Sequence, residues 1–353
     1  MLDLTQPKKA VDFMRYLFFI SQNYSFEILR PVQKLARERG DDVLWFLYMD
    51  RVNTELFSDD EKFTDDIYEA VNYEPDAVFV PGNVVPNFIP GLKVEVFHGF
   101  EWKKKGHFRI RGCFDLYCTQ GPFFTERFQQ LAQSYKYFDV VETGWTKLDP
   151  LFAAKPLPLN NDGKPIVLYA PTFSPSLTSA PDLVDEIRKL SESKDWHWVV
   201  KFHPKMAKEY IKQFEAIKGP NLEILEVGEI SSLLQTADII VSDTSSIITE
   251  FLLLNKPAVT YKNAQPEPVL IDITEPAQLE HAIAEGLTKA PQRLKLIAEY
   301  NEQIHPYQDG KSAHRLLDAV NKKIIDGKSA PKALPANLFR NLKMRKNLKF
   351  WQW

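Results

Sequence analysis

Cysteine is scarce in this chain, since its 353 residues include only Cys113 and Cys118. The two thiols are too widely spaced for a CxxC motif and no second pair exists, so we expect buried thiols in a reducing compartment rather than a metal or redox site. Long apolar runs are also lacking. The run at 16–20 is too short for a signal peptide or for a membrane span of about 20 residues, so we expect a soluble or peripheral protein.

Three nucleotide-site motifs are absent as well: the P-loop, GxGxxG and DxD. Without the first two, ATP hydrolysis and dinucleotide binding have no local support. Without the third, we do not expect a metal held on a diphosphate in that common manner, and we expect no cofactor. The formal net charge of −3 also argues against a nucleic-acid partner.

Short apolar runs alternate with amphipathic stretches, and the chain is too long for one ordinary core. This pattern predicts two α/β domains with parallel sheets and right-handed crossovers. The expected strands are 16–21, 43–48, 76–81, 94–99, 114–119, 138–144, 166–172, 197–204, 222–227, 237–243 and 257–261. The expected helices are 26–39, 122–134, 181–193, 206–217, 230–236 and 245–254.

Composition suggests where the domains meet. The stretch 153–165 is rich in Pro and Asn and lacks periodicity, which is typical of a linker. We therefore expect an N-terminal domain at 1–152, a C-terminal domain at 166–321 and a separate tail at 322–353.

Polar motifs follow several of the expected strands, where open α/β sheets bind ligands. His98 ends one strand, the motif KFHPK at 201–205 ends another, and SDTSS at 242–246 follows a third and opens a helix. Free backbone N–H groups and hydroxyls at a helix N-terminus suit a phosphate, although SDTSS also fits a plain helix cap. A single histidine at a strand end is more often structural. Two, one in each half, suggest a shared cleft where a histidine takes a proton from a hydroxyl.

A run of three lysines, Lys103, Lys104 and Lys105, follows His98. It fits either a solvated loop or a surface that attracts an anionic substrate.

The order of these motifs resembles that of the CDP-glycerol glycerophosphotransferase family, which includes teichoic-acid primases and polymerases. The resemblance spans roughly 94–320. It rests on HG at 98–99, GWTKLD at 144–149, YAPT at 169–172, KFHPK at 201–205, the segment 237–261 and DGKSAHR at 309–315. It implies a GT-B architecture, with two Rossmann-type parallel-sheet domains facing a central cleft, the acceptor on the N-terminal domain and the CDP-linked donor on the C-terminal domain.

The resemblance also implies roles for single residues. His98 would be the base on the acceptor hydroxyl, His203 would contact the donor phosphates, and Ser245 and Ser246 would bind the diphosphate. The other implied donor-side residues are Thr172, Lys201, Ser242, Asp243, Thr244, Glu250, Asp309 and Gly310, and the implied acceptor-side residues are Gly99, Lys103 and Lys104. The implied reaction is attack of an acceptor hydroxyl, on a cell-surface polysaccharide or a lipid-linked molecule, at the phosphorus that bears the polyol, with release of CMP.

The chain departs from the family pattern at Thr146, Lys147, Ser174 and Thr244. These departures leave the donor open between glycerol phosphate, ribitol phosphate and a sugar. A GT-B sugar transferase or a nucleotide-sugar epimerase is therefore an alternative, and a non-catalytic binding protein is a third.

The tail 322–353 is basic and aromatic. It has nine Lys or Arg residues and one acid, for a net charge of +8, and it includes Leu338, Phe339, Leu342, Phe350, Trp351 and Trp353. Bases mixed with Trp and Phe suit an anionic membrane surface, which predicts a cytoplasmic protein held peripherally on the inner face of the cell membrane. A disordered tail, or one docked on the N-terminal domain, is the alternative.

Overall fold

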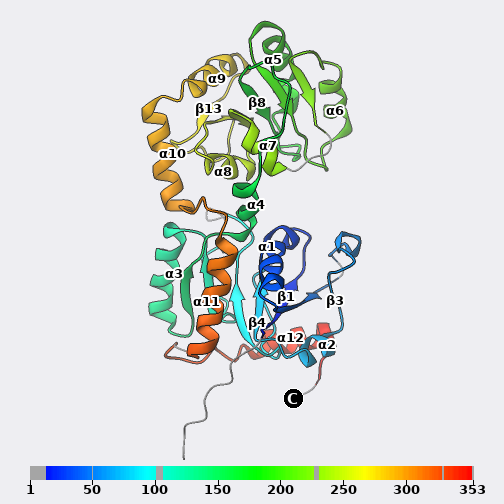
Figure 1. Ribbon diagram of the computed structural model, residues 1–353, viewed down its shortest axis with the longest axis vertical. Helices are drawn as coiled ribbons and strands as arrows, with labels where there is room; N and C mark the ends of the chain where they lie inside the picture. Colours follow the sequence, from blue (N-terminus) through cyan, green and yellow to red (C-terminus); the bar gives the residue numbers. More distant parts are fainter. Residues whose placement is uncertain (1–12, 50, 101–105, 226–229, 328–329, 352–353) are drawn as a thin grey trace, which may run out of the picture. The chain divides into compact units, whose positions relative to one another are not determined.

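The computed structural model describes residues 13–49, 51–100, 106–225, 230–327 and 330–351 (Figure 1). The chain divides into two compact units. Unit 1 comprises residues 1–147 and 311–353, and unit 2 comprises residues 148–310. The chain therefore passes from one unit to the other twice.

Unit 1 is built on a parallel sheet of seven strands in the order β3-β2-β1-β4-β5-β6-β7. Its strands are β1 (Arg15–Ile20), β2 (Asp42–Leu47), β3 (Phe63–Thr64), β4 (Ala77–Val80), β5 (Leu92–Glu95), β6 (Leu116–Thr119) and β7 (Asp139–Glu142). Strands β4, β5 and β6 are buried along their whole length, and β1 and β2 are buried after their first residue, as expected for parallel strands covered on both faces. The strand order reverses between β1 and β4, which makes that point the place where such a sheet binds ligands.

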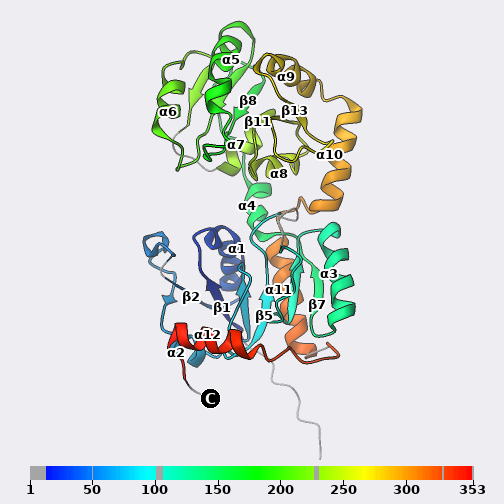
Figure 2. The ribbon, with the colours of Figure 1, turned by 180° about the vertical axis from the view of Figure 1, so that it is seen from behind.

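Among the residues that the structure describes, five α-helices belong to unit 1, which is seen from behind in Figure 2. They are α1 (Ser25–Glu38), α2 (Ile67–Asn72), α3 (Pro122–Tyr135), α11 (Ser312–Asp326) and α12 (Leu338–Leu348). Helix α11 packs against α1 and β5, and α3 packs against β6 and β7. Both cysteines lie in this unit and are buried and free, as predicted. Burial raises the pKa of the Cys113 thiol to about 11 and raises that of Cys118 as well.

Unit 2 contains a parallel sheet of six strands in the order β10-β9-β8-β11-β12-β13, so its strand order reverses between β8 and β11. The strands are β8 (Ile166–Tyr169), β9 (His197–Val200), β10 (Leu222–Ile224), β11 (Ile239–Ser242), β12 (Ala258–Tyr261) and β13 (Ile271–Ile273). The helices are α4 (Asp149–Ala153), α5 (Ala180–Ser193), α6 (Lys208–Glu215), α7 (Ile230–Thr236), α8 (Ile247–Leu252), α9 (Leu279–Leu287) and α10 (Pro291–Ile304). The order of the strands is that of a Rossmann-type sheet.

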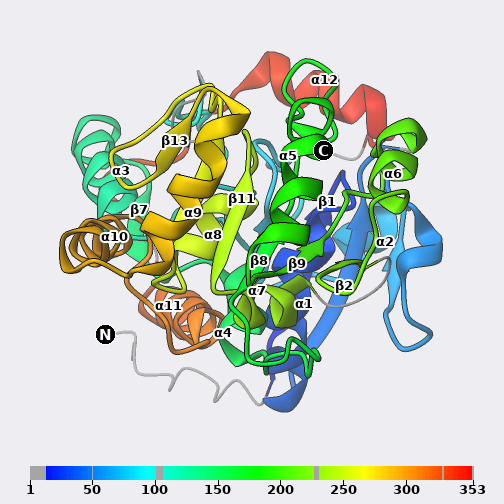
Figure 3. The same ribbon diagram turned by 90° about the horizontal axis from the view of Figure 1, so that it is seen from above.

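The core of unit 2 lies between its sheet and the helices α5, α6 and α9, whose ribbons are seen from above in Figure 3. Alternate residues of each strand, such as Val167 and Tyr169 on β8, point to one face, as the period of two in a strand requires. There they pack against the apolar sides of α5, α6 and α9, which contribute Ile187, Phe214 and Ile283. The second-half alternation of the sequence therefore predicted the sheet, whereas β13, α9 and α10 were not predicted.

The predicted strands that carry the polar motifs end earlier than expected. The strand predicted at 94–99 ends at Glu95, because Phe97 has φ of 57°, a backbone conformation that a strand excludes. Likewise the strand predicted at 197–204 ends at Val200. Both histidines of interest therefore lie on loops beyond their strands.

The C-terminal segment differs from the expected division of the chain. The boundary expected after residue 321 does not match a boundary between units, since α11 and α12 both return to unit 1. Met344 of α12 and the nearby Phe350 are buried, and the Phe350 ring stacks on Phe88 with centroids 4.6 Å apart. Residues 338–350 are thus docked on unit 1, and Trp353 lies outside the described residues. Across the described chain, no helix combines the length and hydrophobicity needed to cross a membrane.

Candidate active site

The turn after β5 places His98 at the carboxyl edge of the first sheet. Both backbone polar groups of Phe97 are engaged there: its N–H donates to the buried Glu95 carboxyl, and its carbonyl accepts from Trp145 Nε1 at 3.4 Å. Burial raises the pKa of the Glu95 carboxyl well above its usual range, although the Phe97 N–H and the Arg111 charge act in the opposite direction. Because a left-handed backbone at phenylalanine is costly, these contacts fix the turn that precedes His98.

The half-buried His98 imidazole is held from two sides. Its Nδ1 lies 3.1 Å from the carbonyl oxygen of Pro81, and its ring stacks on Tyr24 with centroids 5.4 Å apart. A carbonyl oxygen can only accept, so Nδ1 carries the proton and Nε2 holds the lone pair of the neutral ring. The contact therefore gives His98 the tautomer that accepts a proton at Nε2.

The other acceptor-side candidates are only partly placed. The Gly99 carbonyl accepts from Gln120 Nε2 at 3.0 Å, which ties the loop to the end of β6. Lys103 and Lys104 lie outside the described residues.

Asp243 joins the loops after β8 and β11 in unit 2. It is fully buried, and its carboxylate accepts from the backbone N–H groups of Thr172, Ser179 and Thr244 and from the Ser179 hydroxyl, at 2.7–3.1 Å. These hydrogen bonds give Asp243 the task of holding the two loops in place.

The remaining hydroxyls of the SDTSS motif divide into two kinds. The Ser242 hydroxyl donates to the Ala170 carbonyl at 2.6 Å, and the Thr244 hydroxyl accepts from the Ala264 N–H at 3.0 Å. Ser245 is half-buried and Ser246 is exposed. Ser246 directly precedes α8, yet its side chain makes no capping hydrogen bond, so the plain helix-cap interpretation does not hold for it.

His203 lies on the loop after β9 and differs from His98 in its hydrogen bonding. Its exposed ring stacks on Phe173 with centroids 4.3 Å apart, and its Nδ1 accepts from the Lys205 N–H at 3.0 Å. The proton of the neutral ring therefore resides on Nε2. Burial and the charge of Lys205 lower the pKa of the imidazole, which favours this neutral form. His203 is thus prepared to donate a hydrogen bond through Nε2.

The last donor-side candidates also lie in unit 2. Glu250 is buried on α8, and Lys201 is half-buried directly after β9. Gly310 is the final residue of the unit and has φ of 64°, and a Cβ there would lie 3.2 Å from the Asp149 carbonyl oxygen. The positive φ and this close approach therefore favour glycine over any other residue at position 310. Asp309 is exposed beside it.

The structure brings most of the donor-side candidates to one edge of the second sheet. Phe173 follows Thr172 and stacks on His203, so the loops after β8 and β9 touch, and Asp243 links the β8 loop to the β11 loop. These loops surround the point where the strand order reverses. Among the described residues, no group of three or more His, Cys, Asp or Glu side chains is suited to hold a metal ion.

Sequence reasoning missed residues that support the site. Glu95 and Trp145 hold the His98 turn, and Phe173 and Ser179 hold the donor-side loops. A usable signal existed for Glu95, since a carboxyl inside a buried strand needs a local reason. No comparable signal marked Ser179, whose partner Asp243 is 64 residues away.

Solved structures share this fold. A putative UDP-N-acetylglucosamine 2-epimerase from Listeria monocytogenes matches with a TM-score of 0.64 at 14% identity, over 92% of this chain and 100% of that one. The wall teichoic acid polymerase TagF matches with a TM-score of 0.58 at 14% identity, over 88% of this chain and 89% of that one. At such identities the similarity concerns the fold alone, which is GT-B, as predicted.

Curated relatives are similar over part of their length. The teichoic acid ribitol-phosphate polymerase TarK of Staphylococcus aureus is 24% identical over 226 residues, covering 56% of this chain and 43% of that protein. The teichoic acid glycerol-phosphate primase of Bacillus subtilis is 29% identical over 179 residues, covering 47% of this chain and 46% of that protein. The chain thus spans less than half the length of either relative.

A family comparison covers more than half of the chain. The family described as CDP-Glycerol:Poly(glycerophosphate) glycerophosphotransferase matches residues 112–322. This range begins before β6 and runs through the donor-side loops to α11. The chain belongs to this glycerophosphotransferase family.

Proposed function

We propose that the protein transfers glycerol phosphate, or a related polyol phosphate, from a CDP-activated donor to a hydroxyl of a polysaccharide or lipid-linked acceptor. The observation that carries this proposal is the opposite hydrogen bonding of the two histidines. His98 donates through Nδ1 and keeps a lone pair on Nε2, whereas His203 accepts at Nδ1 and keeps a proton on Nε2. A base for a hydroxyl and a donor for a phosphate are the two parts that phosphoryl transfer needs.

In the proposed step, His98 Nε2 takes the proton of the acceptor hydroxyl, and the oxygen of that hydroxyl attacks the phosphorus that bears the polyol. A new P–O bond forms, the bond to the bridging oxygen breaks, and CMP leaves with that electron pair. His203 Nε2–H and the hydroxyls of Ser245 and Ser246 then stabilise charge on the phosphates, and Lys201 adds a positive charge. Most of the rate enhancement comes from positioning and charge stabilisation.

Donor binding separates this proposal from the alternatives. A ligand that binds only the native state at about 100 times its dissociation constant stabilises it by about 2.7 kcal/mol. CDP-glycerol or CDP-ribitol should therefore raise the melting temperature by roughly 5 °C or more, whereas UDP-, GDP- and CMP-sugars should not.

Two variants sharpen the donor test. His203→Ala should lose the shift, and His203→Gln should keep part of it, because a glutamine amide can donate where the imidazole Nε2–H did. A shift with UDP-sugars alone would favour the epimerase or sugar-transferase alternative, and no shift with any cytidine nucleotide would favour a non-catalytic protein.

We also propose that α12 rests on an anionic membrane surface at the inner face of the cell membrane. The exposed fractions of Leu338, Phe339 and Trp351 are 68%, 92% and 52%, although the other side of α12 is docked. Lys343 and Lys346 are exposed on the same helix. Apolar side chains with bases beside them suit an interface with anionic lipid.

A point variant tests membrane binding better than a truncation, because removing the tail would uncover the surface that Phe350 covers. Phe339→Ser should lower partition onto phosphatidylglycerol vesicles about 30-fold, since a buried phenyl contributes roughly 2 kcal/mol. Flotation measures the partition. The matched control is Leu177→Ser, which changes an exposed leucine of unit 2. Unchanged partition of the Phe339 variant, or equal partition onto neutral lipid, would remove the idea.

A further inference from the structure

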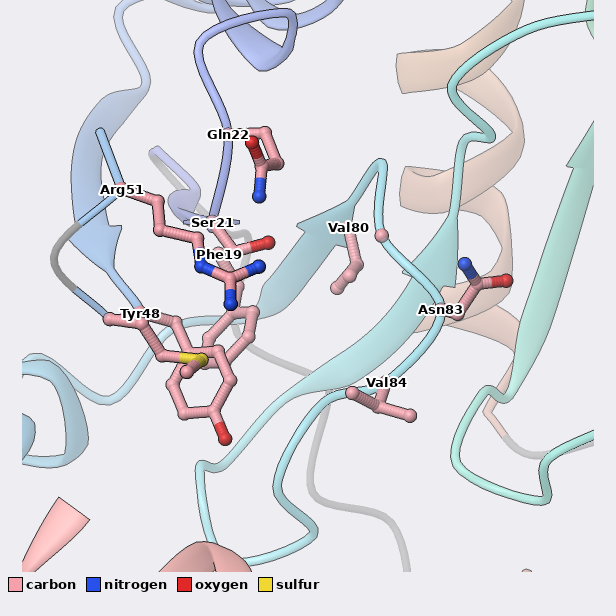
Figure 4. Close-up of a pocket in the computed structure, with 10 residues that line it drawn as sticks. Phe19, Ser21, Gln22, Tyr48, Arg51, Val80, Asn83 and Val84 are labelled. Carbon is pink, nitrogen blue, oxygen red and sulfur yellow. The ribbon is translucent and has the colours of Figure 1, made fainter. Parts of the chain in front are cut away.

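A cavity of about 80 Å³ opens at the carboxyl edge of the first sheet, outside the site described above (Figure 4). Residues that follow three strands line it: Ser21 and Gln22 after β1, Arg51 after β2, and Asn83 after β4. Strands β1 and β4 flank the reversal of strand order, and β2 pairs with β1. The cavity has room for a few water molecules, and hence for a group the size of a phosphate, but not for a whole sugar nucleotide.

The lining of the cavity is suited to an anion. Arg51 is exposed at its rim, and Figure 4 shows its guanidinium reaching toward Ser21 and Gln22. Among the described residues that line the cavity there is no carboxylate. The loop with Ser21 and Gln22 leads into α1, a helix of 14 residues whose N-terminal end favours negative charge.

The backbone holds this arrangement in place. The Tyr48 N–H donates to the Ile20 carbonyl at 2.7 Å, which keeps the ends of β1 and β2 together. Met49 has φ of 71°, and the Arg51 N–H donates back to the Met49 carbonyl at 2.9 Å. This turn brings Arg51 back toward the sheet edge instead of leading it away.

The cavity shares two loops with His98. Pro81, whose carbonyl holds the His98 ring, immediately precedes Gly82 of the lining, and Tyr24, which stacks on that ring, is two residues beyond Gln22. A ligand in the cavity therefore lies on the loops that orient the proposed base.

We propose that this cavity is a phosphate subsite for the acceptor, in which Arg51 binds the phosphate ester next to the reacting hydroxyl. The inference rests on the proposed transfer reaction and assigns a place on this chain to the phosphate ester that a poly(glycerophosphate) acceptor carries beside its hydroxyl. The inference also gives a role to the positive charge of Arg51, which lies at the edge of unit 1, the unit that is not expected to bind the nucleotide.

A binding experiment tests the subsite without any turnover. Glycerol 3-phosphate, inorganic phosphate and glycerol are titrated into the full chain and followed by calorimetry or NMR. Glycerol 3-phosphate should bind more tightly than inorganic phosphate, and glycerol should not bind. Arg51→Gln should weaken glycerol 3-phosphate about 10-fold, the usual effect of losing a charge-assisted hydrogen bond. Lys34→Gln, which removes an exposed charge from α1, should change nothing.

The outcomes separate the possible sources of the anion. Binding lost in His203→Ala but kept in Arg51→Gln would place the anion on the donor side and overturn the proposal. Inorganic phosphate binding as tightly as the ester would also overturn it, because the site would then recognise a free ion.

Kinetics provide the second arm of the test. With a phosphorylated acceptor, Arg51→Gln should raise the acceptor KM about 10-fold and leave the donor KM unchanged. If no CDP-polyol supports transfer, the proposed function is wrong, and the glycerol 3-phosphate titrations still test the subsite. If transfer occurs and the acceptor KM is unchanged, the subsite alone is wrong.

Discussion

Replacing His98 with alanine is expected to lower kcat about 10³-fold and to leave the dissociation constant of the CDP-polyol donor unchanged. A positioned general base contributes about 10²–10⁴ in rate. The Pro81 carbonyl fixes the proton on Nδ1, so Nε2 is the nitrogen that would take the hydroxyl proton. Steady-state assays of CMP release, together with thermal shifts by the donor, measure the two quantities separately.

An asparagine variant shows whether the loss reflects the base or only the packing. In His98→Asn the side-chain amide N–H replaces Nδ1–H and can still donate to the Pro81 carbonyl, but no group remains to accept a proton. We therefore expect His98→Asn to be as slow as His98→Ala, with a melting temperature close to that of the unaltered protein. A kcat within threefold of the unaltered protein in either variant would show that His98 is not the base.

Replacing Asp243 with alanine is expected to destabilise unit 2 by about 3 kcal/mol or more. The change leaves four donors without their acceptor in a fully buried place: the N–H groups of Thr172, Ser179 and Thr244 and the Ser179 hydroxyl. Each buried polar group left unsatisfied costs about 1–3 kcal/mol. For a unit of this size the melting temperature should fall by roughly 6–12 °C.

The isosteric variant separates charge from volume at this position. In Asp243→Asn an amide NH₂ faces N–H and O–H groups that donate to a carboxylate oxygen in the unaltered protein, so this variant should also destabilise the unit. Binding of the CDP-polyol should weaken as well, because the loops lose their anchor. Asp195→Asn is the control. The Asp195 side chain is 86% exposed, and its Oδ1 lies 3.7 Å from Lys164 Nζ, an exposed ion pair that contributes little to stability. A melting temperature of Asp243→Asn equal to that of the control would contradict the positioning role.

The strands could be predicted from the sequence because buried parallel strands appear as short apolar runs between amphipathic stretches. The carboxyl ends of the strands could not be predicted in the same way, since the end of β5 depends on the left-handed φ of Phe97. That conformation is in turn held by Glu95 and Trp145, which are far apart along the chain. Local pattern alone does not report such a long-range constraint.

The return of the chain to unit 1 was likewise outside the reach of pattern reasoning. The apolar side of α11, with Leu316, Leu317 and Val320, fits either sheet equally well as a pattern. Only its packing on α1 and β5 decides the matter. The tail shows the same limit, because its bases and aromatics indicated a surface, whereas the burial of Met344 and Phe350 depends on partners such as Phe88.

The places of the candidate residues in the fold were predicted better than their hydrogen-bond partners. His98 and His203 lie at the carboxyl edges of their sheets, as expected. Asp243, which the resemblance places on the donor side, accepts hydrogen bonds from backbone N–H groups up to 71 residues away, and no local pattern predicts these contacts. The tautomers of the histidines could not be predicted either, since Pro81 and the Lys205 N–H set them through the folded backbone.

The identity of the leaving group tests the proposed transfer most directly. The protein would be incubated with CDP-glycerol and a phosphorylated acceptor, and the products followed by ³¹P NMR. Attack at the phosphorus that bears the polyol predicts one CMP and one new phosphodiester for each donor consumed. Release of CDP with no new phosphodiester, or an unchanged donor, would contradict the proposed reaction.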